Sequence, residues 1–122
     1  MPRFVILRHV TPPSFPRPTH YDFMLEADGV MKTWAMPVEP IPGILQIIEQ
    51  IHDHRLDYFE FEGEIAGGKG TATRWDRGDY ATVRQSDDEW CVQLVGGALQ
   101  ARVTLRRQSD NPSRWEFRIE PA

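Results

Sequence analysis

The segment His20-Tyr21-Asp22-Phe23-Met24-Leu25-Glu26 places an imidazole and a carboxylate two residues apart. It has the composition of a β-strand, in which side chains alternate between the two sides of a sheet. One side then carries His20, Asp22, Met24 and Glu26, and the other carries the core-forming Tyr21, Phe23 and Leu25. His20 and Asp22 would lie about 7 Å apart along the strand, close enough to act on one ligand.

This pair has two interpretations. An imidazole and a carboxylate are suitable ligands for Mn, Zn or Fe. A single His-x-Asp is a weak motif, however, and the alternative is a solvated face on which Asp22 simply forms an ion pair with His20.

Three further histidines strengthen the metal interpretation. His9 ends an apolar segment, and the loop 10–19, which contains four prolines, separates it from His20, so the two imidazoles could meet. Together with Asp22 they could supply three metal ligands and leave positions open for water or substrate. His52 and His54 share a face if their segment is extended, and either could be a fourth ligand or a general acid. The alternative is that all four are surface histidines with ordinary pKa values.

The composition is that of an ordinary globular domain. The chain has 122 residues, of which 40% are hydrophobic and 26% charged, so we expect a single domain over residues 1–122. No apolar run is long enough to cross a membrane, and the N-terminus has no signal-peptide pattern, so the expected compartment is the cytoplasm. Cys91 is the only cysteine and lies in an apolar run, which predicts a buried, inert thiol.

The net charge of −4 argues against generic polyanion binding. The charge is uneven, because the first half of the chain is acidic and the second half is nearly balanced. Arginines alternate there with Trp75, Tyr80 and Trp90, which could form a face that contacts phosphates and bases. The alternative is the solvated exterior of a barrel.

The remaining pattern predicts a mainly β protein with one short helix. Strands are expected at 3–9, 20–27, 30–36, 71–75, 80–85, 90–95, 99–106 and 114–119, with Trp34 in the core. The helix is expected at 44–51, where apolar residues have helical spacing. Residues 76–79 and the glycine-rich 66–70 are read as turns, and the latter lacks the ending of a phosphate-binding P-loop. Short, closely spaced strands favour a compact antiparallel β-barrel.

The order of these motifs resembles the 3′-phosphoesterase domain of bacterial and archaeal DNA ligase D over nearly the whole chain. The similarity rests on His9, His20-Tyr21-Asp22-Phe23-x-Leu25-Glu26, Asp28-Gly29-Val30, Thr33-Trp34-Ala35, Asp53-His54, Leu56-Asp57-Tyr58, Phe61-Glu62-Gly63, Gly68-x-Gly70, Trp75-Asp76-x-Gly78, Leu99 to Arg106 and Trp115-Glu116-Phe117.

The resemblance implies a β-barrel enzyme that heals DNA 3′ ends during end joining. It implies a Mn²⁺ or other divalent ion such as Zn²⁺, held by His9, His20 and Asp22. The enzyme would remove a 3′-terminal ribonucleoside and then the remaining 3′-phosphate, with His54 and Tyr58 on the phosphate. The implied partners are the 3′ end of primer–template DNA and end-joining repair proteins, without a membrane.

The chain also departs from the family. Met24 and Gln46 stand where the family usually has arginines, Val38 replaces a lysine, and Arg55 replaces a proline. Losing two guanidiniums removes bidentate phosphate clamps. Arg55, next to His54, could supply the missing charge and is the third expected catalytic residue. The length leaves no room for polymerase or ligase modules, so a stand-alone domain is expected.

Two alternatives follow from these departures. The chain could be a catalytically weakened module that holds a 3′-phosphate or a repair protein. It could also be a metal-dependent hydrolase of a smaller phosphoester, which would fit the acidic net charge.

Overall fold

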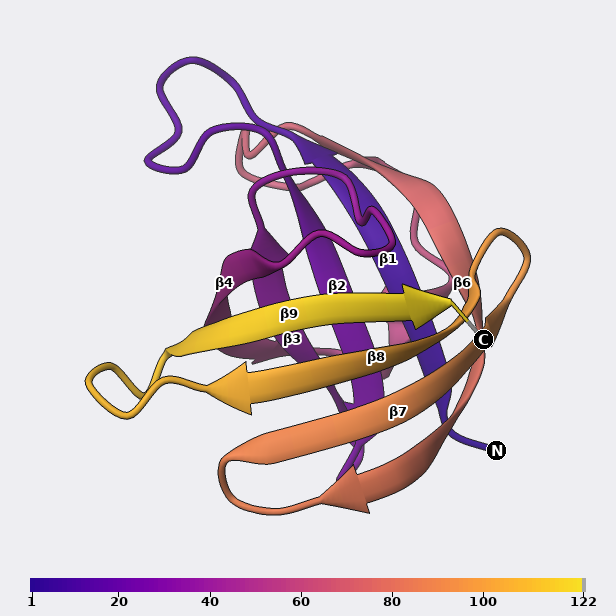
Figure 1. Ribbon diagram of the computed structural model, residues 1–122. Coiled ribbons are helices and arrows are strands. Elements are labelled where there is room, and N and C mark those ends of the chain that lie inside the picture. The colour runs from indigo at the N-terminus through magenta and orange to yellow at the C-terminus, as the bar shows by residue number, and fades with distance from the viewer. Residues whose placement is uncertain (122) are drawn as a thin grey trace.

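The chain folds into one antiparallel sheet that closes on itself. The computed structural model describes residues 1–121. The sheet has the order β1-β2-β3-β4-β9-β8-β7-β6-β5, and an additional pairing of β1 with β6 closes it into a barrel (Figure 1). Its strands are β1 (Arg3–Val10), β2 (His20–Ala27), β3 (Val30–Met36), β4 (Gln46–His54), β5 (Gly63–Glu64), β6 (Thr71–Gln85), β7 (Glu89–Gly96), β8 (Gln100–Arg107) and β9 (Arg114–Pro121). The predicted antiparallel barrel is therefore confirmed.

The barrel interior holds the main core. Phe23 and Leu25 of β2 point into it, as the strand alternation predicted, and both are fully buried. Trp34 is 1% exposed and packs its ring 5.7 Å from that of Trp115, which confirms its predicted core position. Cys91 is also buried, as expected.

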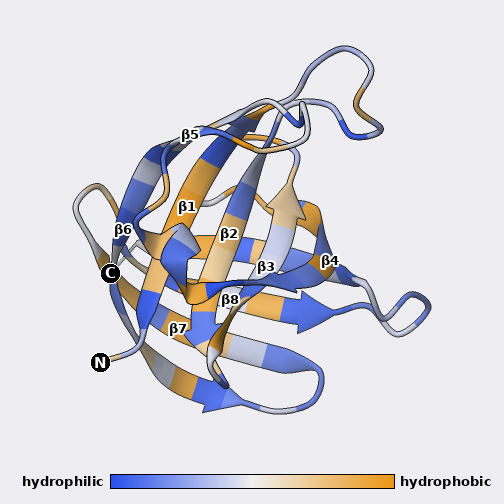
Figure 2. Cartoon of the chain, turned by 180° about the vertical axis from the view of Figure 1, so that it is seen from behind, coloured by the Kyte–Doolittle hydropathy of each residue, from blue (hydrophilic) through white to orange (hydrophobic). Residues whose placement is uncertain are grey.

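A second, smaller apolar cluster lies on the outside of the barrel, over β1, β2 and β3. It contains Val5, Leu7, Met24, Met31 and Ala72. The segment that follows β4 covers this face with the 3₁₀ helix η1 (Leu56–Phe59) and with Ile65. Figure 2 looks onto this side and shows the apolar bands of β1 and β2 behind the covering segment. The outer face of β2 is thus enclosed rather than solvated.

The helix predicted at 44–51 is wrong. Residues Gln46–His54 form β4, which joins β3 to β9 in the barrel. Gln46 and Ile48 are buried while Ile47 and Glu49 are exposed, a period of two. The apolar residues of this segment fit both the helical period of about 3.6 and the strand period of two. Pairing with two neighbouring strands favours the extended conformation. The only helix in residues 1–121 is η1.

The turn predicted at 76–79 is also wrong, because β6 runs through it. The first part of β6 pairs with β1 and the last part with β7, and Gly78 is paired on both sides, with Phe4 and Gly96. A Cβ on Gly78 would lie 2.0 Å from the carbonyl oxygen of Val95, so only glycine permits this approach. Asp76 accepts backbone hydrogen bonds instead of starting a turn of its own.

The described part of the chain contains no helix long and apolar enough to span a membrane.

Candidate active site

Strand pairing brings the predicted metal ligands together. His9 and His20 are direct cross-strand partners in the β1–β2 pair, and Asp22 follows on the same outer face of β2. One ligand atom from each of the three lies within 4.8 Å of the others. All three are buried, with 8%, 4% and 6% of their surface exposed. Asp22 does pair with His20, as the simpler interpretation held, but the face is not solvated.

Backbone carbonyls fix how the two imidazoles are oriented. Nε2 of His9 donates to the carbonyl oxygen of Lys69 at 2.7 Å, and Nδ1 of His20 donates to that of Pro18 at 2.9 Å. The other ring nitrogens face Asp22, at 3.6 Å for Nδ1 of His9 and 3.0 Å for Nε2 of His20. Imidazoles held by a second hydrogen bond in this way are typical of metal ligands.

The carboxylate of Asp22 is only partly satisfied by these contacts. Its Oδ1 atom is buried and has no partner with hydrogen-bond geometry, although His20 approaches it closely. The ring nitrogens of His9 and His20 and the carboxylate oxygens of Asp22 offer a cation three ligand atoms within 4.8 Å of one another. The donor set fits a divalent metal ion with three protein ligands and open positions.

The electrostatics of the three residues are coupled. Burial alone would raise the pKa of Asp22, but the neighbouring imidazoles of His20 and His9 favour the ionised carboxylate, outweigh burial and lower this pKa to about 2. The closeness of Asp22 raises the pKa of His9 in turn, against the effect of burial. Asp22 is therefore ionised at neutral pH and supplies the negative charge of the site.

His54 stands beside this group and is held neutral. Because β4 is extended, the rings of His52 and His54 stack with centroids 4.6 Å apart, which confirms their shared face. Burial lowers the pKa of His54, and the neighbouring His52 adds to the effect. Nδ1 of His54 donates to the carbonyl of His52 at 3.0 Å, which leaves Nε2 as an acceptor. The Tyr58 ring packs edge-on against His54 at 4.9 Å.

One cavity of about 630 Å³ joins these groups. The predicted site residues that line it are His9, His20, Asp22, His52, His54 and Tyr58. Arg55 is different. Its side chain is 80% exposed, lies 3.4 Å from Asp57 and lines a neighbouring depression. That depression shares Tyr58, Ile65 and Lys69 with this cavity, but Arg55 does not line the cavity itself.

Three charged residues that line the cavity were missed by sequence reasoning, namely Arg17, Glu49 and Lys69. Arg17 comes from the proline-rich loop and forms an ion pair with Glu49 of β4 at 2.8 Å. Lys69 is the unspecified residue of Gly68-x-Gly70, so the motif did not single it out. Arg17 and Glu49 belong to no motif, and only the folded path of the loop brings Arg17 to the cavity.

The substituted family positions place no charge in the cavity. Met24 is fully buried in the outer apolar cluster. Gln46 is buried as well, and its amide nitrogen donates to the backbone carbonyls of Val38 and Glu39, at 3.2 Å each. Gln46 thus anchors the loop before β4 instead of presenting a cation.

Known proteins share this sequence pattern. The model of the DNA ligase D 3′-phosphoesterase domain matches residues 14–107. The multifunctional non-homologous end joining DNA repair protein LigD of Mycobacterium tuberculosis (strain H37Rv) is 38% identical over 122 residues, covering 92% of this chain. LigD of Pseudomonas aeruginosa is 46% identical over 66 residues, covering 50% of this chain, and LigD of Mycolicibacterium smegmatis is 34% identical over 119 residues, covering 84%.

These relatives are much longer proteins. The chain spans 15% of the Mycobacterium tuberculosis protein and 8% of the Pseudomonas aeruginosa protein. The family model matches well over half of the chain. The β-barrel and its histidine–aspartate group agree with the assignment of the chain to this family. The chain belongs to the DNA ligase D 3′-phosphoesterase domain family.

Proposed function

We propose that the chain is a divalent-metal-dependent phosphoesterase that acts on DNA 3′ ends in end-joining repair in the cytoplasm. It would remove a 3′-terminal ribonucleoside and the remaining 3′-phosphate. The observation that carries the proposal is the convergence of His9, His20 and Asp22 in a buried group with the donor atoms of a metal site. The ion would be Mn²⁺, or another divalent ion such as Zn²⁺.

The cavity supplies roles for the residues around the ion. A bound divalent ion would neutralise phosphate charge and activate the attacking water. The fixed tautomers of His9 and His20 keep the required lone pairs directed inward. Asp22 contributes one negative charge, so a bound divalent ion would leave the site net positive and attractive to a phosphate.

His54 and Tyr58 would act on the phosphate itself. Neutral His54 can accept a hydrogen bond or a proton at Nε2. The Tyr58 hydroxyl would donate a hydrogen bond to a phosphate oxygen, and its packing against His54 holds it at the cavity. Arg55 would act on the phosphate only from the rim, because it lines the adjoining depression and not the cavity.

The test is release of phosphate from a primer–template whose primer carries a 3′-phosphate. With added Mn²⁺ we expect turnover in the wild type and loss of at least about 100-fold in His20→Ala. Asp53→Asn is the matched control, because Asp53 pairs with Lys32 outside the site. Equal turnover in His20→Ala and the wild type would refute the proposal.

A second candidate is a binding module for a 3′-phosphate or a repair protein. It is favoured by Met24 and Gln46, which leave the cavity without the arginines usual in the family. This candidate predicts that the wild type binds the 3′-phosphate primer but does not turn it over. Turnover that disappears in His20→Ala would exclude it.

A further inference from the structure

A second cavity, of about 310 Å³, adjoins the histidine–aspartate cavity. The two share four lining residues, Arg17, Pro18, His20 and Glu49, so they adjoin at these side chains. His20 faces the metal group with Nε2, and the same ring forms part of the wall of the second cavity. A ligand that fills both would pass directly by the proposed reacting centre.

The second cavity combines an apolar floor with cationic sides. Its floor is formed by Ala35, Pro37, Ile47 and Ile48. Ile47 is 41% exposed, which is unusual for an isoleucine on a strand and leaves apolar surface open to a ligand. Such a surface suits the flat face of a sugar or base.

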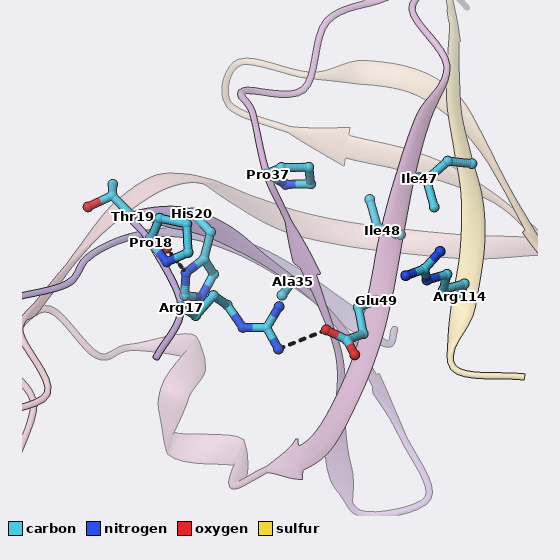
Figure 3. A pocket seen from close by; sticks show the side chains of 10 residues that line it. All are labelled: Arg17, Pro18, Thr19, His20, Ala35, Pro37, Ile47, Ile48, Glu49 and Arg114. Atoms are coloured by element: carbon cyan, nitrogen blue, oxygen red, sulfur yellow. Dashed lines mark hydrogen bonds and ion pairs between the residues drawn. The ribbon is translucent and has the colours of Figure 1, made fainter. Parts of the chain in front are cut away.

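Arg17 and Arg114 provide the positive charge. Figure 3 shows Arg17 reaching across the cavity to Glu49, with Arg114 on the other side of Glu49. Arg17 and Glu49 neutralise each other through their 2.8 Å contact. Arg114 has no ion-pair partner within 4.0 Å among residues 1–121, so the cavity has a net positive charge in an acidic protein. A phosphate is the group that matches this charge.

We propose that the second cavity binds the nucleotide that precedes the reacting 3′ end, with Arg114 on the internal phosphodiester. The cleaved phosphate would lie at His9, His20 and Asp22, and the strand would run past Arg17 into the second cavity. The proposal rests on the proposed function and adds to it the position of the second nucleotide of the strand, beside Arg114.

The test compares thymidine 3′-phosphate with the dinucleotide that adds one 5′ thymidylate, both with a 3′-phosphate. Calorimetry in EDTA measures affinity while metal-dependent turnover is stopped. We expect the dinucleotide to bind about 10-fold more tightly, and the log–log salt dependence of its affinity to be steeper by about 0.7, the increment for one phosphate on a single strand. Arg114→Ala should remove both the tighter binding of the dinucleotide and its steeper salt dependence.

Arg118→Ala is the matched control. It removes an exposed arginine from the same strand, β9, at a position that lines a different depression, beside Arg84 and Glu89. Its affinity ratio between dinucleotide and mononucleotide should equal that of the wild type. An equal affinity for the two ligands in the wild type, or a full dinucleotide advantage in Arg114→Ala, would overturn the proposal.

The same ligands separate this proposal from the proposed function. Intact dinucleotide preference in EDTA with no phosphate release in Mn²⁺ would support the strand site and refute hydrolysis. Turnover with equal efficiency on both ligands would support hydrolysis and refute the strand site.

Discussion

His9 and His20 face each other as cross-strand partners in the β1–β2 pair, with ring centroids 4.8 Å apart. The proline-rich loop between them starts from one partner and returns to the other. Its backbone also fixes the site, because the carbonyl of Pro18 accepts the Nδ1 hydrogen of His20. The loop therefore connects the two ligands, orients one of them and delivers Arg17 to the cavity.

Removing a ligand should abolish metal binding. We expect calorimetric titration of the metal-stripped wild type with Mn²⁺ to show one site, and His9→Ala, His20→Ala and Asp22→Ala each to weaken binding by at least about 100-fold, more than the loss of an outer-shell partner would cause. Asp53→Asn should bind as the wild type does. Unchanged binding in any of the three ligand variants would remove that residue from the metal site.

The contacts between Asp22 and His9 should stabilise the metal-free protein most between about pH 4 and pH 6.5. The lowered pKa of Asp22, about 2 against 3.8, contributes about 2 kcal/mol above pH 4, and this is lost as the pH falls toward 2. The raised pKa of His9 contributes to the free energy of unfolding below pH 6.5, and this stabilisation is lost as the pH rises through the raised pKa. Urea unfolding at several pH values should show both slopes. Asp22→Asn should flatten both pH slopes. A free energy of unfolding that does not change with pH in the wild type would contradict the electrostatic coupling of Asp22 and His9.

Tyr58→Phe should lower turnover without disturbing the fold. The ring stays packed against His54, while the hydroxyl expected to contact the phosphate is lost. We expect kcat to fall by about 100-fold, as when a single stabilising donor is removed. A rise in KM with unchanged kcat would show instead that the hydroxyl only binds substrate.

The acid limb of the pH–rate profile should reflect His54. Because burial and His52 lower its pKa below the ordinary 6.5, neutral His54 persists below that pH and activity should be retained there. Measurement of kcat from pH 5 to pH 8 checks this. In His54→Ala, the remaining activity should no longer fall at the pH of the wild-type acid limb. An acid limb centred above pH 6.5 would argue against His54 as the proton acceptor.

Arg17→Ala should reduce kcat/KM more than Arg55→Ala. Arg17 lines the cavity, so its loss removes a cation close to the phosphate, and we expect a decrease of about 10-fold or more. The Arg55 side chain is 80% exposed and lines the adjoining depression, where solvent screens its charge. Parallel steady-state kinetics on the 3′-phosphate primer decide between them, and a larger effect of Arg55→Ala would restore it as the main phosphate contact.

Asp76→Ala should destabilise the barrel. Its carboxylate accepts the backbone N–H groups of Gly97, Ala98 and Leu99 at 2.8 to 3.0 Å, and removal leaves these donors without a partner. We expect a loss of about 3 kcal/mol in the free energy of unfolding, measured in urea, with no loss for the exposed Asp79→Ala. A change below about 0.5 kcal/mol would show that water replaces the carboxylate.

Strand alternation predicted the site better than it predicted the element boundaries. His20, Asp22 and Met24 were assigned to one face because a period of two leaves no other arrangement, and on that face His20 and Asp22 meet His9 in the proposed metal site. For residues 44–51 the same apolar residues fitted two periods, and only pairing with β3 and β9, remote in sequence, decides between them.

Other features depend on contacts that a single sequence does not encode locally. Asp76 and Gly78 are residue types typical of turns. In the structure, however, Asp76 accepts hydrogen bonds from a neighbouring turn, and Gly78 allows two strands to approach closely. Arg17 gave no signal because its loop has no regular period, and its position follows from the folded path of that loop. Arg55 was favoured by sequence adjacency to His54, but β4 ends at His54 and Arg55 lines the adjoining depression, a position that adjacency alone does not determine.

The β1–β6 pairing also has a consequence for how the site assembles. His9 sits at this junction, opposite Ala72, and its ring nitrogen bonds the carbonyl of Lys69, 60 positions away in the chain. Contacts of such long range form slowly, because the entropy of ordering the intervening chain is lost before the contact is gained. The hydrogen bond that orients the His9 ring is therefore completed only when β1 pairs with β6. If His9 is a metal ligand as proposed, we expect the rate at which refolding chains become able to capture Mn²⁺ to report barrel closure.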